Sequence, residues 1–227
     1  MFGDYYHMNR NYKPKSIVLP PRKIKRAVSA DIDSSVIISN QQATWIAQKI
    51  KESVKRSQRI QRAPEKSNCC YKFTLLYRHS RDGNINTLKD FRQRCASKGP
   101  TVTVGKVFNT EEILGGYNPI SWSDYYSLDH SSFIQTSESF IFSLNRGKLD
   151  ESIVSFVTDS DKAIWEYKDS FPHFGYGPDL IFGGYGKQKT RSKKLLYPIA
   201  IRSTTTTDQF ELVDWEVFSI MKINNLV

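Results

Sequence analysis

The alternation of apolar and polar residues predicts a chain built mainly from short β-strands. Period-two alternation is typical of a strand with one buried face, and clusters of Gly, Pro, Asn or Asp end these runs about every 8–12 residues. This spacing favours an antiparallel sandwich or barrel with a flanking helix. The expected strands are residues 71–78, 101–107, 112–117, 137–144, 152–157, 163–168, 195–201 and 210–220.

A helix is expected to follow Ser39. Ser39 and Gln42 have the spacing of a capping box, and Ile46 and Ile50 then lie on one apolar stripe at helical spacing. The other face is rich in Lys, Arg and Gln, so we expect the stripe to pack on the following domain rather than on a membrane surface. The preceding SSVIIS (34–39) is expected to be a short strand or an extended segment.

A second helix is expected after Asn86, which could cap it. Leu88, Phe91 and Cys95 share one face of this helix at i, i+3 and i+7. A thiol on that face is expected to be buried and inert. The chain has three cysteines and four scattered histidines, without the clustered spacing of a zinc site.

The basic charge of the chain is concentrated in its first third. The net charge is +10, and residues 1–66 contain 14 Lys/Arg against 5 Asp/Glu, whereas residues 67–227 contain 19 against 18. Because nucleic acid is bound by clustered charge, we expect binding to nucleic acid or an anionic membrane, if any, through residues 10–66. The chain is expected to comprise a disordered basic arm (1–30), an extended segment with the amphipathic helix (31–66) and a folded domain (67–227).

The N-terminus has no secretory signal, and no apolar run approaches the roughly 20 residues that span a bilayer. A cytoplasmic location is therefore expected. The basic patch Arg22–Arg26 has two interpretations, a nuclear-localisation signal or a solvated tail.

The glycine-rich stretch PHFGYGPDLIFGGYGKQKT (172–190) first suggests a phosphate-binding loop. Such a loop needs G-x-x-x-x-G-K-[ST], but Gln188 follows Gly186-Lys187 and Ile181 stands where the first glycine belongs. We instead expect Asp179 to begin a short strand, DLIF. The glycines expected to turn the chain at its two ends are Gly175, Gly177, Gly183 and Gly184.

No arrangement of residues predicts catalysis. The chain has no G-x-S-x-G motif, and the pairs His79-Ser80 and His130-Ser131 are adjacent in sequence, which is poor geometry for a nucleophile and its base. Neither a catalytic centre nor a cofactor or metal site is expected. Among enzymatic alternatives, Cys95 is the only plausible nucleophile.

Several motif residues have expected structural roles. Gly83 suits a turn that needs positive φ. Gly115-Gly116 inside a strand indicates a bulge or a close backbone approach. The polar residues Arg81, Asp82 and Glu138 are expected to make a buried hydrogen bond or turn salt bridge, with a partner contact as the alternative. The residues expected to fill the core between the two sheets are Phe140, Phe142, Trp215 and Phe218.

Several motifs, in order, resemble the TLDc domain family, which is shared by oxidation-resistance proteins and nuclear-receptor-coactivator-like stress proteins. FTLLYRHSRDGNINTLKDFRQRC is followed by GPTVTVGKV and EILGGYNPISW. SESFIFSL contains Glu138, GPDLIFGG is the glycine-rich segment, and DWEVFSI contains Trp215 and Glu216. The resemblance covers roughly residues 68–220, and IDSSVIISNQQATWIAQKI looks like the connector between BTB and TLDc domains in fungal proteins.

The resemblance implies a mainly β fold: a two-sheet antiparallel β-sandwich with flanking helices. It also implies a non-enzymatic interaction module in oxidative-stress response, whose protein partners include the vacuolar proton-pumping ATPase. The alternative that the resemblance leaves open is an adaptor-like protein related to BTB-TLDc proteins. No small-molecule substrate is expected.

Overall fold

We describe the fold from a computed structural model. It describes residues 28–58, 69–83, 87–124, 131–145, 147–167, 170–177, 179–183, 190–202 and 209–224. Four predictions fall on residues outside these ranges: the arm up to residue 27 with its Arg22–Arg26 patch, the Asn86 cap, His130 of the His130-Ser131 pair and the turn at Gly184.

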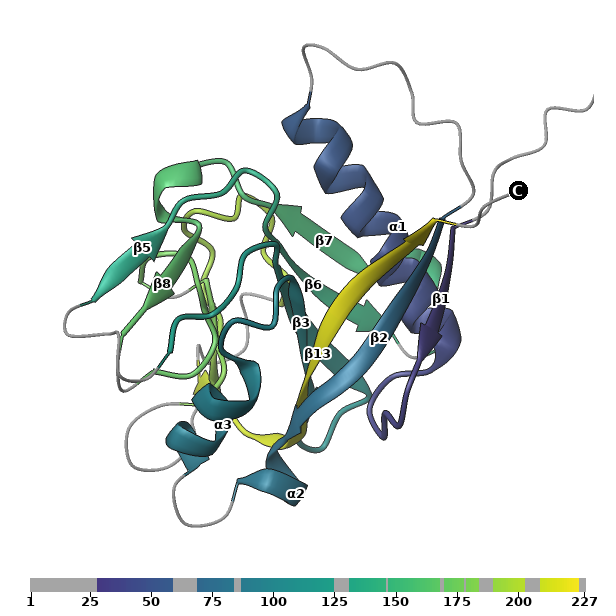
Figure 1. Cartoon of the computed structure of the whole chain (residues 1–227), viewed down its shortest axis with the longest axis horizontal. Helices are drawn as coiled ribbons and strands as arrows, with labels where there is room; N and C mark the ends of the chain where they lie inside the picture. The colour runs from purple at the N-terminus through teal and green to yellow at the C-terminus, as the bar shows by residue number, and fades with distance from the viewer. Residues whose placement is uncertain are drawn as a thin grey trace, which may run out of the picture.

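A seven-stranded sheet forms the larger layer (Figure 1). β1 is parallel to β2, and the other neighbouring strands are antiparallel. The last strand, β13, lies between β2 and β3, so the end of the chain completes the inside of the sheet. In spatial order the strands are β1 (Val28–Ile32), β2 (Cys69–Arg78), β13 (Leu212–Asn224), β3 (Thr101–Val107), β4 (Glu112–Asn118), β6 (Phe140–Asn145) and β7 (Ile153–Phe156).

A second sheet of six short antiparallel strands packs against the larger one. Four of its strands have only two residues, which is too short for alternation to be visible in the sequence. In spatial order they are β12 (Gln209–Phe210), β11 (Thr190–Arg191), β10 (Leu180–Ile181), β9 (His173–Phe174), β8 (Ile164–Glu166) and β5 (Ser132–Ile134). The predicted two-sheet antiparallel sandwich with flanking helices is confirmed.

Helices cover the large sheet and one end of the sandwich (Figure 1). The longest one begins as predicted, because Ser39 accepts a hydrogen bond from the Gln42 N–H and Gln42 accepts one from the Ser39 N–H. The α-helices are α1 (Asn40–Ser57), α2 (His79–Asp82) and α3 (Thr87–Cys95), and the 3-10 turns are η2 (Leu149–Glu151) and η3 (Ser160–Lys162).

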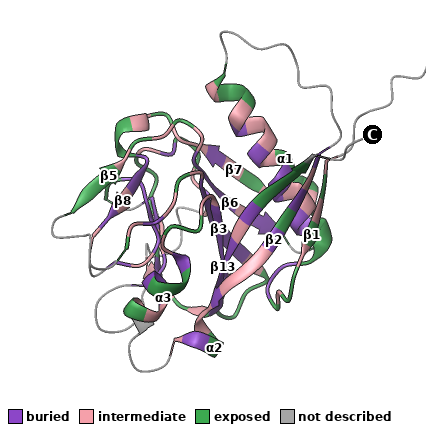
Figure 2. Ribbon diagram, viewed as in Figure 1, coloured by how far each residue is buried: buried purple, intermediate pink, exposed green. Residues whose placement is uncertain are grey.

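The large sheet separates two hydrophobic cores, so its central strands are buried on both faces (Figure 2). One core lies between the sheets and contains Trp215. The other lies under α1, where Ile46 and Ile50 pack on the sheet. Phe140, Phe142 and Phe218 were predicted to fill the core between the sheets. That prediction was wrong, because all three lie in the core under α1. The period-two spacing of Phe140 and Phe142 shows that both lie on one face of their strand, but it does not show which layer covers that face.

Two further segments differ from expectation. β1 begins at Val28, inside the predicted arm, and pairs with β2. The apolar stripe of α1 packs on the sheet, as predicted. Residues 195–201 form bends rather than a strand. A buried carboxylate, Asp179, accepts the N–H groups of Leu195 and Leu196, so these do not enter a β-ladder.

Glycines are required where an aromatic ring approaches the backbone closely, from the neighbouring strand at Gly115 and from the small sheet at Gly116. A Cβ atom at Gly115 would lie 2.2 Å from Phe142 Cζ, and one at Gly116 would lie 2.5 Å from Phe174, while the strand keeps regular register on both sides. Of the two predicted reasons for Gly115-Gly116, the close approach is therefore confirmed, and the strand has no bulge there. Gly83 has φ −91°, so the predicted positive φ was wrong; its Cβ would lie 2.6 Å from the His79 carbonyl oxygen.

Candidate functional site

The polar residues singled out in the sequence do not converge on one centre. Among the described residues, no group of three or more His, Cys, Asp or Glu side chains could hold a metal ion. Three of them, Asp82, Asp179 and Glu216, instead follow a pattern that two further residues share: each is a buried carboxylate that accepts a backbone N–H. The five are Asp82, Glu166, Asp179, Asp214 and Glu216.

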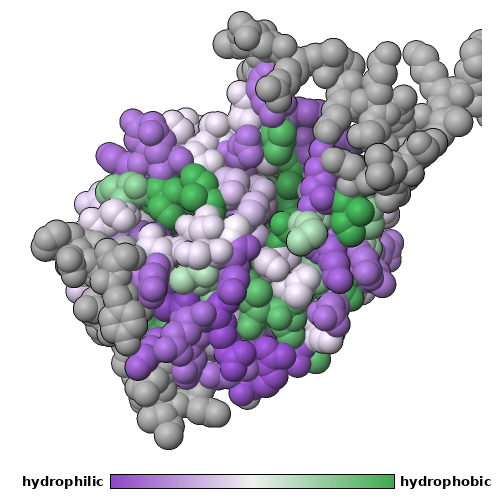
Figure 3. Space-filling model, in the orientation of Figure 1, coloured by the Kyte–Doolittle hydropathy of each residue, from purple (hydrophilic) through white to green (hydrophobic). Residues whose placement is uncertain are grey.

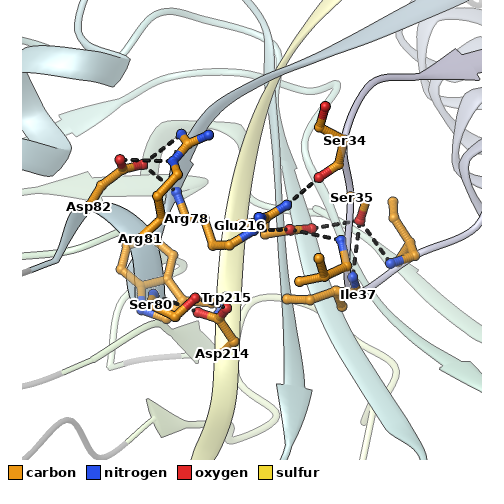
Figure 4. A network of polar contacts seen from close by, with 12 residues as sticks. Ser34, Ser35, Ile37, Arg78, Ser80, Arg81, Asp82, Asp214, Trp215 and Glu216 are labelled. Carbon is orange, nitrogen blue, oxygen red and sulfur yellow. Dashed lines mark hydrogen bonds and ion pairs between the residues drawn. The ribbon is translucent and has the colours of Figure 1, made fainter.

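Glu216 joins β13 to the segment before α1 (Figure 4). Its carboxylate is fully buried, and Oε1 accepts hydrogen bonds from Arg78 Nε at 2.7 Å and from the Val36 N–H at 3.1 Å. Oε2 accepts one from Ser35 Oγ at 2.6 Å. Arg78 also donates to the Ser34 carbonyl oxygen. The ion pair therefore holds residues 34–36 against the sheet.

A groove of about 660 Å³ lies beside this segment. Residues 35–39, Gln41 and Gln42 line it together with Glu111, Gly147 and Leu149. Ser35 Oγ accepts the N–H groups of Ile37 and Ile38, so the wall of the groove is fixed through Glu216.

Two more of these carboxylates hold the turn after β2: Asp82 lies in the turn itself, and Asp214 reaches it from β13 (Figure 4). Asp82 accepts hydrogen bonds from the Arg78 N–H and from Arg81 Nε, both at 2.9 Å. Burial by itself would raise the pKa of Asp82, but Arg81 and the Arg78 N–H outweigh it and hold this pKa below its ordinary value. Asp214 accepts the Ser80 N–H at 3.0 Å. Arg81 and Asp82 thus shape the turn, with Arg81 partly exposed.

His79 and Ser80 do not act as a nucleophile and its base. Ser80 Oγ donates to Asp214, whereas His79 Nδ1 is hydrogen-bonded to the Tyr77 hydroxyl at 3.2 Å. The His79 ring instead stacks on Trp215 at a centroid distance of 5.8 Å. Trp215 therefore belongs to the core and to the support of this turn.

The glycine-rich segment contains a fully buried carboxylate, Asp179. Its Oδ1 accepts the N–H groups of Leu195, Leu196 and Tyr197 at 2.6, 2.9 and 2.9 Å. Burial raises the pKa of Asp179, and these three donors oppose that rise. The chain turns sharply on both sides, with positive φ at Gly175, Gly177 and Gly183.

Sequence reasoning missed the buried ion pair between Arg92 of α3 and Glu166 of β8. Arg92 Nη1 lies 2.9 Å from Glu166 Oε1, and Ser123 donates both its N–H and its hydroxyl to the same carboxylate. The signal was present, because Arg92 lies one turn after Leu88 on the apolar face and Glu166 shares the inward face of its strand with Ile164. This pair fixes α3 to the small sheet.

The two remaining candidates are also structural in their described contacts. Glu138 is half-buried and accepts a hydrogen bond from Ser57 Oγ, at the end of α1, at 2.8 Å. Cys95 is fully buried, as predicted, and burial raises the pKa of its thiol. A thiol with a raised pKa is a poor nucleophile at neutral pH.

His173 predicts a loss of stability in acid. Burial lowers its pKa from 6.5 to about 4, and neither ring nitrogen has a hydrogen-bond partner among the described residues. Between these two pKa values His173 is therefore protonated in the unfolded chain and neutral in the folded chain. We expect unfolding free energy to fall by about 2 kcal/mol between about pH 7.5 and pH 5 from this group alone. Urea unfolding of wild type and His173→Phe measures it; equal pH dependence of the two would contradict the assignment.

Comparison with known protein families gives the context for this arrangement. Among the described residues, no helix is both long and apolar enough to cross a membrane. A search of curated proteins gives no match. Residues 32–221 match the family model of the TLDc domain. The match begins at the end of β1, earlier than the motifs at 68–220, and includes α1 and all five buried carboxylates. This chain therefore belongs to the TLDc domain family.

Proposed function

We propose that this chain is a non-catalytic TLDc interaction module of the oxidative-stress response that binds the vacuolar proton-pumping ATPase. The observation that supports it best is the family match over residues 32–221, which extends across both sheets. The stress role and the pump are what membership of this family implies. The pump is thus the first partner to test.

The polar contacts of the described residues support a module that acts through its surface. The buried carboxylates that an enzyme could use as acids or bases are each occupied by backbone N–H groups. Two of them, Glu166 and Glu216, also pair with arginines. These contacts hold loops in fixed positions, which favours binding by preformed surfaces.

Direct binding to purified vacuolar ATPase is the test. The full chain, immobilised through a tag, is expected to retain the ATPase at physiological salt and to change its rate of ATP hydrolysis. An unrelated basic protein of similar charge serves as control, because a net charge of +10 could retain an acidic complex non-specifically. No retention above that control would contradict the pump as partner.

Cys95→Ser separates this proposal from an enzymatic one. The thiol is buried, so we expect the variant to bind the ATPase and to protect cells from peroxide as the wild type does. If the variant lost protection while keeping the melting temperature of the wild type, a reaction at Cys95 would have to be considered.

A further inference from the structure

Aromatic side chains line the outer face of the small sheet. On β5 and β8, Ile134 and Ile164 pack into the core between the sheets, so their neighbours Phe133 and Trp165, which are paired in register, point outward. Tyr176, in the turn after β9, packs on Phe133 with ring centroids 5.5 Å apart. Phe133 is 38% exposed and Tyr176 is 59% exposed. Large aromatic side chains with this exposure are typical of binding surfaces.

Leu195 extends this surface on one side. Its side chain is 47% exposed and lies over Gly177, where an added Cβ would be 2.9 Å from Leu195 Cδ1. We name Phe133, Trp165, Tyr176 and Leu195 the outer platform. On the face drawn in Figure 3, apolar side chains form small areas among polar ones.

The outer platform is fixed from below. The backbone that presents Leu195 donates three N–H groups to the fully buried carboxylate of Asp179. Trp165 precedes Glu166, which is held by the buried Arg92. Side chains presented on such a rigid frame lose little conformational entropy when they bind.

Cations surround the outer platform. Lys162 Nζ lies 5.7 Å from the centre of the Tyr176 ring, and the exposed Lys193 and Lys194 directly precede Leu195. Two acids, Asp159 and Asp161, lie on the nearby η3 turn. Asp159 accepts the Asp161 N–H, and Asp161 accepts a hydrogen bond from Gln135, so both are engaged within the molecule. A partner with carboxylates beside its apolar side chains complements this charge pattern.

We propose that the outer platform binds a segment of a partner protein in which apolar side chains are flanked by Asp or Glu. The proposal rests on the interaction role above and adds the surface and the chemistry of the partner. A single-stranded nucleic acid fits less well, because Leu195 is aliphatic and offers no ring on which a base could stack.

The probe is a synthetic helical peptide of about 20 residues, with Leu and Phe on one face and Glu elsewhere. Calorimetric titration with the full chain should give binding that weakens with salt. Tyr176→Ser/Leu195→Ser is expected to weaken it roughly tenfold or more, and Lys193→Glu/Lys194→Glu to weaken it and remove much of the salt dependence. The same peptide with Lys in place of Glu should bind far less.

Matched controls lie on the other sheet. Met221 and Ile223 of β13 are 66% and 39% exposed, so Met221→Ser/Ile223→Ser removes similar apolar surface elsewhere. Lys55→Glu/Lys72→Glu changes the charge equally on α1 and β2. Both should bind the peptide within about twofold of the wild type. Four results would overturn the proposal. The platform and control variants could lose the same affinity, or the Lys peptide could bind as well as the Glu peptide. An oligothymidine could bind more tightly than the Glu peptide, or the Glu peptide could fail to bind.

A second experiment measures the binding of the same variants to purified vacuolar ATPase. If the wild type binds the Glu peptide but not the ATPase, the proposed partner is wrong and the outer platform stands. If the ATPase binds wild type and Tyr176→Ser/Leu195→Ser equally, the module uses another surface for the pump, and the outer platform is rejected as the site of that contact.

Discussion

Replacing Arg92 with methionine is expected to lower the free energy of unfolding by about 3–5 kcal/mol. The Arg92 side chain is 1% exposed, and it donates to Glu166 at 2.9 Å and to the carbonyl oxygens of Tyr167 and Ser170 at 3.1 and 3.0 Å. Methionine fills much of the same space but leaves the Glu166 carboxylate buried without its cation. Equilibrium unfolding in urea at neutral pH, with a check that the slope is unchanged, measures the loss.

Adding Glu166→Gln to the Arg92→Met protein tests the explanation. Glutamine keeps an oxygen for the Ser123 N–H and carries no charge, so part of the lost stability should return. A further loss of stability in the double variant would show that the unpaired buried charge is not the cause.

Glu216→Ala is expected to cost about 2–4 kcal/mol and to release the segment before α1. The change leaves Arg78 without its carboxylate, and it removes the acceptor of the Val36 N–H and Ser35 Oγ. Urea unfolding gives the global effect. Hydrogen exchange should show faster exchange at the Val36, Ile37 and Ile38 amides, because these are held directly by Glu216 or through Ser35.

Glu211→Ala is the matched control for that experiment. Glu211 lies just before β13 and is exposed, so its loss should change the free energy of unfolding by no more than about 0.5 kcal/mol. Unchanged exchange at residues 36–38 in Glu216→Ala would mean that the capping of α1 by Ser39, rather than Glu216, holds this segment.

Local periodicity was enough for most of the longer elements. β3 has the predicted bounds, and α1 begins at the predicted capping box, because each depends on contacts between residues near in sequence. β10 lies inside the predicted DLIF strand, whereas β9 and β11 were missed because two residues are too few to show alternation. The bends at 195–201 were missed because their N–H groups bind the carboxylate of Asp179, 16 or more residues earlier in the chain.

The sequence by itself determined the mainly β fold, the helix at Ser39 and the burial of Cys95, because each follows from local spacing along the chain. Only the tertiary structure decided which core receives Phe140, Phe142 and Phe218, and which donors occupy Glu216 and Asp179. Alternation along a strand defines two faces, but it does not say which layer packs on each face. A carboxylate in a motif likewise shows no function until the fold brings its hydrogen-bond donors to it.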